Sequence, residues 1–98
     1  MAKIIVSTSN NNPVAKQYQK EVHLINIIEV KFLMVLAGTI TSLSSSGLTT
    51  IQYKINAGSY ATPSFPLAYA ANDVITFTYA YTDLTALTGN LILIGKDN

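Results

Sequence analysis

The stretch Val74-Ile-Thr-Phe-Thr-Tyr-Ala-Tyr-Thr82 decides the fold class of this chain. Large apolar side chains alternate in it with small or polar ones, which is the period of a β-strand with one face on a core and one toward water. The predicted inner face consists of Ile75, Phe77, Tyr79 and Tyr81, and the outer face of Thr76, Thr78, Ala80 and Thr82. Turn formers, Asn72-Asp73 before and Asp83 after, bound the strand at both ends.

Two further strands are expected, one from the same alternation and one from a continuous apolar run. Between Thr50 and Asn56 the apolar residues Ile51, Tyr53 and Ile55 alternate with polar ones. Asn56-Ala-Gly58 follows directly and supplies residues that accept a positive φ, so we expect a hairpin turn there, with the chain resuming at Ser59-Tyr60. The continuous apolar run Leu91 to Ile94 lies between Gly89-Asn90 and Gly95-Lys96 and predicts a buried final strand.

The segment from Tyr18 to Leu36 fits two periods. Its apolar residues alternate, but Leu24, Ile27, Ile28 and Lys31 also have a helical spacing. Enrichment in β-branched and aromatic residues favours long or broken strands, and helix stays open as the alternative for Val22 to Leu36. Together with the turns over residues 28–95, these strands predict an all-β antiparallel sandwich or a small barrel.

The first residues form a separate segment. Lys3 to Val6 predicts a short strand, and the polar run from Ser7 to Pro13 consists of turn formers. We therefore expect an N-terminal arm, residues 1–16, and one domain, residues 17–98. The arm has only three consecutive strongly apolar residues, fewer than the roughly 7–15 of a secretory leader, so synthesis and retention in a cytoplasm are expected.

Composition favours contact with other protein. The 98 residues are 49% hydrophobic and only 11% charged, so Ser, Thr, Asn, Ala and Tyr must form much of the surface of a domain with a modest core. The net charge is +1, with six scattered lysines and no arginine, which argues against a nucleic-acid partner. Glu29 and Lys31 interrupt the most apolar stretch, Val22 to Gly38, which argues against a membrane span.

No set of residues predicts catalysis, a cofactor or a metal. His23 is the only histidine and there is no cysteine, so neither a metal site nor a catalytic triad can be built on it. Three of the five carboxylates lie beside turn signals, where Asp accepts backbone hydrogen bonds. Serine elbow, Walker and dinucleotide glycine patterns are all missing from the sequence. We therefore expect a protein that is not an enzyme.

Aromatic and arm residues supply the candidates for protein contact. Tyr53, Tyr79 and Tyr81 lie on predicted inner faces and are assigned to the core. The candidates are Tyr60, Phe65 and Tyr69, which fall in or near loops, together with Ile4, Ile5 and Val6 of the arm. For Tyr60 and Tyr69, packing over a sheet edge remains the alternative.

Two segments carry a resemblance to a known family, namely Ile51-Gln-Tyr-Lys-Ile-Asn-Ala-Gly-Ser-Tyr60 and the later Pro66-Leu-Ala-Tyr-Ala-Ala-Asn-Asp-Val-Ile-Thr-Phe77. Together they resemble small immunoglobulin-like modules of bacteriophage structural proteins and some bacterial surface proteins. The resemblance covers about a quarter of the chain and includes a Tyr-x-Ile-Asn-x-Gly-x-aromatic hairpin. It implies an immunoglobulin-like β-sandwich with the N-terminal arm attached.

The same resemblance implies a role in assembly. It points to a bacteriophage virion protein made in the host cytoplasm, in first place an auxiliary capsid, or decoration, subunit. Its partners would be the major capsid or another virion protein and further copies of itself, with neither nucleic acid nor membrane. The alternative is a carbohydrate-binding or adhesive immunoglobulin-like module that uses Tyr60 and Tyr69 as aromatic platforms.

Overall fold

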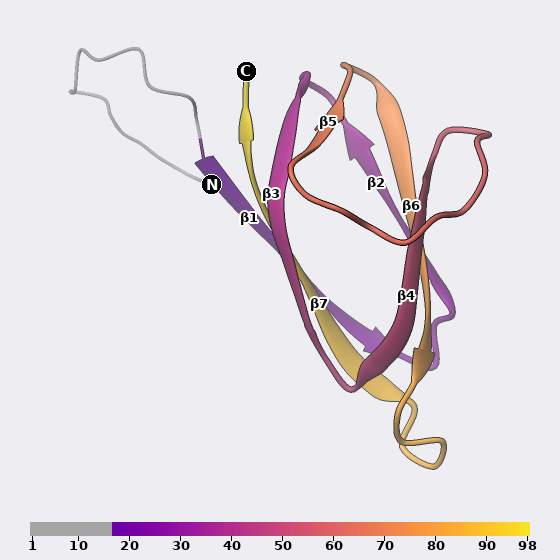
Figure 1. Cartoon of the computed structure of the whole chain (residues 1–98). Helices are drawn as coiled ribbons and strands as arrows, with labels where there is room; N and C mark the ends of the chain where they lie inside the picture. Colours follow the sequence, from indigo (N-terminus) through magenta and orange to yellow (C-terminus); the bar gives the residue numbers. More distant parts are fainter. Residues whose placement is uncertain (1–16) are drawn as a thin grey trace.

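A computed structural model of the chain describes residues 17–98, and the predicted strand at residues 3–6 lies outside them. The described part contains seven strands (Figure 1). They are β1 (Gln17–Ile25), β2 (Glu29–Met34), β3 (Gly38–Ser46), β4 (Leu48–Ile55), β5 (Leu67–Tyr69), β6 (Asp73–Tyr81) and β7 (Thr88–Asp97). Within residues 17–98, no helix is long and apolar enough to cross a membrane.

The strands form two antiparallel sheets. One has the order β1-β7-β3-β5 and the other the order β2-β6-β4, so each connection between consecutive strands passes from one sheet to the other. Figure 1 shows the two layers facing each other along their length. The predicted all-β antiparallel sandwich is therefore confirmed.

The pairings are nested within one another. β1 pairs with β7, β2 with β6 and β3 with β5, and inside these Tyr53 of β4 forms an isolated bridge with Ala61. The chain is thus one long hairpin whose tip lies just after β4. Two further pairings, β3 with β7 and β4 with β6, roll this hairpin into two layers. This is the connectivity of a jelly roll in which one strand is reduced to the bridge at Ala61.

The immunoglobulin-like order is not confirmed. In a constant-type immunoglobulin domain the first two strands share a sheet, whereas β1 and β2 lie in different sheets here. The connection between them is tied to the second sheet by Tyr81 of β6, whose hydroxyl donates to the Ile27 carbonyl (2.6 Å) and accepts from the Ile27 N–H (2.9 Å). These bonds hold the β1–β2 connection against the second sheet.

The ambiguous segment from Tyr18 to Leu36 forms strands. It is broken at Asn26, which has a φ of 54° and donates its backbone N–H to the Leu87 carbonyl (2.8 Å). The final strand is longer than predicted and is not buried throughout. Leu91 and Leu93 face the core, but Ile94 is 39% exposed, because the outer face of the β1-β7-β3-β5 sheet is open.

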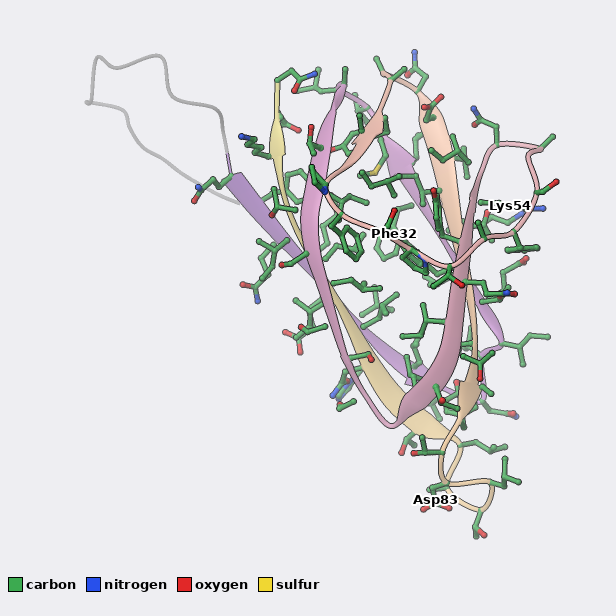
Figure 2. The ribbon with its side chains drawn as sticks, viewed as in Figure 1. Phe32, Lys54 and Asp83 are labelled. Atoms are coloured by element: carbon green, nitrogen blue, oxygen red, sulfur yellow. The ribbon has the colours of Figure 1, made fainter. Side chains whose placement is uncertain are left out.

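The core lies between the sheets and is centred on Phe77. Its ring meets that of Phe32 edge-on, with centroids 5.9 Å apart and planes at 80°, and lies 6.5 Å from that of Tyr53. Figure 2 shows Phe32 in the space between the sheets. Opposite them, the other sheet contributes buried aliphatic side chains, namely Leu24, Ile40, Leu91 and Leu93.

One residue of the predicted outer face is buried. Thr76 is only 2% exposed, although it was assigned to the water side of its strand. It stands between Lys31 of β2 and Lys54 of β4, which are its register partners on the two sides. Long lysine side chains cover neighbouring surface with their aliphatic stems, so the middle strand is shielded even on its outer face.

The alternation along β6 predicts unequal effects of two neighbouring substitutions. Phe77→Ala should lower the free energy of unfolding by roughly 3–5 kcal/mol, because it leaves a cavity at the centre of the core. Thr78→Ala, one residue further and partly exposed, should change it little. Urea denaturation of both variants measures the difference, and equal losses would show that the facing of β6 is misassigned.

Candidate functional site

The structure places the predicted contact residues in three different settings. Ile4, Ile5 and Val6 lie outside the described residues. Tyr60 and Phe65 are partly exposed on the connection between β4 and β5, as predicted for contact residues. Tyr69 is only 7% exposed and belongs to the core, whereas the prediction placed it in an exposed contact patch or packed over a sheet edge. Of the three candidates among residues 17–98, only Tyr60 and Phe65 are therefore on the surface.

Tyr60 is held across the outer face of the β2-β6-β4 sheet. Its ring lies 4.9 Å from the Lys54 ammonium on β4, and its hydroxyl donates a long hydrogen bond (3.4 Å) to the carboxylate of Glu29 on β2. The turn that leads to it is rigid, because Asn56 pairs with Val74 through the backbone and through its side chain. Tyr60 is thus a fixed aromatic ring rather than a loose loop residue.

Tyr69 is held by a second tyrosine. The hydroxyls of Tyr18 and Tyr69 are 2.5 Å apart, and burial raises the pKa of both phenols; for Tyr18 the hydrogen bond with Tyr69 raises the pKa further. The rings fit only because two glycines face them. A Cβ at Gly95 would lie 2.5 Å from the Tyr18 hydroxyl, and one at Gly38 would lie 2.6 Å from the Tyr69 hydroxyl.

The tyrosine pair lines part of a hollow in the surface. The hollow has a volume of about 180 Å³, and Tyr18 and Tyr69 are part of its lining. Three largely exposed aliphatic side chains also line it, and we call these the rim patch: Leu33, Val35 and Leu36. The rim patch lies at the end of the sandwich where β1 starts and β2 ends.

The opposite end of the sandwich carries a second exposed aliphatic cluster. We call it the apical patch, and it consists of Ile25, Ile28 and Leu84, with Ile28 75% and Leu84 79% exposed. Ile25 ends β1, and Ile28 and Leu84 lie on the β1–β2 and β6–β7 connections, which are joined by the Asn26–Leu87 hydrogen bond. Neither patch was predicted. The signals that could have revealed them are Ile27-Ile28 and Val35-Leu36, where adjacent apolar residues interrupt the alternation.

The polar candidates have local structural roles. His23 is exposed and hydrogen-bonded through Nδ1 to the Asn90 side chain. Asp73 accepts from the Ala70 N–H and Asp83 from the Thr85 N–H, and these bonds lower the pKa of both carboxyls, which confirms their predicted role in turns. No group of three His, Cys, Asp or Glu residues within 17–98 is placed to hold a metal ion.

Comparison with known proteins identifies no family for this chain. No protein-family model, no curated protein and no solved structure matches the chain. The exposed patches and the position of Tyr60 are therefore the features of residues 17–98 from which a function can be argued.

Tyr79 and Tyr81 offer a matched pair of substitutions. The Tyr79 hydroxyl is buried with no hydrogen-bond partner among the described residues, so Tyr79→Phe should raise the free energy of unfolding by roughly 1 kcal/mol. Tyr81→Phe should lower it by roughly 1–3 kcal/mol, because both hydrogen bonds to Ile27 are lost. Denaturation curves of the two variants measure this, and destabilisation by both would indicate that Tyr79 has a partner.

The buried phenols also predict a dependence on alkaline pH. Burial raises the pKa of Tyr79 to about 12, and the pKa values of Tyr18 and Tyr69 are raised as well. A tyrosine in the unfolded chain has a pKa of about 10, which is lower than in the folded chain, so folding favours the neutral form. The stabilisation is complete below about pH 10 and is lost as the pH rises toward about 12. Unfolding free energies over this range should fall steadily, and Tyr79→Phe should reduce the slope.

Proposed function

We propose that the protein is a non-enzymatic structural subunit of a bacteriophage virion, in first place an auxiliary capsid (decoration) subunit. The observation that carries the proposal is the placement of exposed aliphatic patches at both ends of a rigid sandwich of low charge. Apolar clusters on a small protein mark sites of protein contact. Jelly rolls recur in viral capsid domains, and this argument rests on analogy of fold alone.

The edge of the first sheet supports assembly through strand addition. β1 is nine residues long and, within residues 17–98, pairs along one side only, with β7. The unpaired backbone groups of an edge strand accept a strand from another chain. Residues 1–16, with the strand-prone Ile4-Ile5-Val6, directly precede β1. In the proposed role the arm of one subunit adds to the edge of a neighbour or of the major capsid protein, in a virion assembled in the host cytoplasm.

A carbohydrate-binding or adhesive module is the second candidate, and Tyr60 is the observation that favours it. A fixed, partly exposed aromatic ring is suited to stacking on a sugar, and lectin domains also use jelly rolls. Glycan-array binding that Tyr60→Ala abolishes and Phe65→Ala preserves would favour this candidate. The buried Tyr69 is unsuitable for the same test, since its loss would disturb the core.

The virion role predicts where the chain is found. Quantitative mass spectrometry of purified particles from the source phage should detect the chain in many copies, in a constant ratio to the major capsid protein. Its absence from purified particles would contradict the proposal directly. A structural subunit present in one or a few copies would instead indicate a tail or head-fibre location.

The arm supplies the second prediction of the proposed role. Deleting residues 1–16 should leave a folded monomer, because the seven strands of residues 17–98 pair with one another in both sheets and enclose the core. The deletion should abolish incorporation into particles and strand-mediated assembly, since the added strand is lost. Thermal melting and sedimentation of the truncated chain measure the two effects separately. A full-length variant with Ile4→Ser, Ile5→Ser and Val6→Ser is the matched control, because it keeps the length of the arm and removes only its apolar side chains.

The outcomes separate three roles for the arm. Loss of assembly with an unchanged melting temperature agrees with the anchoring role. Unfolding of the truncated chain would show that the arm belongs to the core sheet of its own subunit. Normal assembly of the truncated chain would show that the arm takes no part in anchoring.

A further inference from the structure

The outer face of the β1-β7-β3-β5 sheet has an apolar centre. Residues two apart on a strand share a face, and Leu91 and Leu93 of β7 are buried in the core. Ile92 and Ile94 therefore lie on the outer face, and Ile94 is 39% exposed. Because β7 has β1 on one side and β3 on the other, the two isoleucines lie inside the face and not at its edge.

Polar side chains surround this centre. The register partners of the two isoleucines on the neighbouring strands are exposed and polar, namely Gln19 and Glu21 on β1 and Ser42 and Ser44 on β3. Lys96, two residues beyond Ile94, continues the outer face of β7 between Gln17 and Thr39. An apolar centre within a polar margin is the usual anatomy of a protein–protein interface.

One anionic and one cationic side chain lie on opposite sides of Ile94. Glu21 is in the row of Ile92, and Lys96 is one row beyond Ile94 in the other direction, each row being about 7 Å from the next. Within residues 17–98, β3 and β5 contain no Asp, Glu or Lys. Ile94 therefore lies midway between an anionic row and a cationic row.

The remaining ionisable groups of the sheet do not disturb this order. The Lys20 ammonium lies 5.4 Å from the centroid of the Tyr18 ring, and Asp97 lines the same hollow as that ring. Both residues alternate to the inner side of their strands. His23 does lie on the outer face, but in the row beyond Glu21 and so further from Ile94.

The order of charges makes the face complementary to a second copy of itself. Sheets that pack face to face keep their strands within about 30° of each other, so their rows can lie opposite one another. A two-fold axis that runs across the strands at Ile94 places the Glu21 row of each copy opposite the Lys96 row of the other. The sideways offset is one strand spacing, about 4.8 Å, which a lysine side chain spans.

We propose that two copies of this chain associate through the outer faces of their β1-β7-β3-β5 sheets, about a two-fold axis at Ile94. The inference deepens the assembly part of the proposed function, and rests on it, by naming a second copy as a partner. The contact uses a face and not an edge, so it is compatible with strand addition at β1. One face of a small domain falls at the low end of specific interface areas, so the dimer is weak in solution.

Charge reversal tests the two-fold arrangement in the full-length chain. Because the symmetry uses each ion pair twice, Glu21→Lys replaces two attractions per dimer by two repulsions, and Lys96→Glu does the same. Each variant should raise the dissociation constant about tenfold or more. Both side chains are exposed, so the melting temperature should stay unchanged. Sedimentation over a concentration series measures the dissociation constant.

Recombining the two reversals is the decisive measurement. An equimolar mixture of the single variants should form heterodimers, because every facing pair is again of opposite charge. The double variant, with Glu21→Lys and Lys96→Glu, should dimerise like the unchanged chain. It keeps the original net charge, so its recovery cannot come from a general attraction between oppositely charged proteins. A double variant that stays monomeric would overturn the two-fold pairing, as would normal dimerisation of either single variant.

The apolar centre is tested separately. Ile94→Ser removes the side chain on the axis and should abolish dimerisation without changing the melting temperature, since Ile94 lies outside the core. Leu84→Ser removes an exposed aliphatic side chain from the apical patch and is the matched control. The control should dimerise normally, and equal losses in the two variants would contradict a contact centred on Ile94.

Two further outcomes separate this inference from the proposed function. An unchanged chain that is monomeric at every concentration would overturn the contact between sheet faces. If that chain is still found in many copies in purified particles, the proposed virion role stands. If the chain dimerises as described but is absent from particles, the contact stands and the virion role fails.

Discussion

The aromatic inner face of the β2-β6-β4 sheet is the constraint on which the rest of the molecule depends. Phe77 at its centre contacts the rings of Phe32 and Tyr53, and such a face is stable in water only when a second apolar layer covers it. Leu91 and Leu93 of β7 provide part of that layer, so the last strand must return to the opposite sheet. The nested pairing of the chain is the arrangement that brings it there.

The exposed patches follow from the same arrangement. When one long hairpin is rolled into two layers, each connection crosses between the sheets at an end of the sandwich. The crossing at Asn26 to Ile28 is anchored by Tyr81, which leaves Ile28 no inner position to occupy. At the other end Val35 and Leu36 lie on the connection between β2 and β3 and are likewise exposed. The fold therefore concentrates unburied aliphatic surface where further subunits can reach it.

Much of the secondary structure was predictable because it depends on neighbours in the sequence. Strict alternation around Phe77 indicated the strand, its ends and its inner face, and Asn56 marked a turn that the structure contains with a φ of 54°. The candidate site was predictable only in part. Tyr60 is exposed as expected, but the burial of Tyr69 depends on Tyr18, which is remote in sequence, and on the space beside Gly38 and Gly95.

The sequence by itself determined the strand class, the low charge, the turn positions and the alternation that assigns Phe77 to the core, since these are properties of residues and their near neighbours. Only the tertiary structure decided the order of strands in the sheets, the burial of Thr76 and the two apolar ends. Alternation indicates that a face is covered but not by which strand, because many pairings bury the same residues. Long-range contacts such as Tyr81 with Ile27 select one pairing, and the surface that remains exposed is set by that selection.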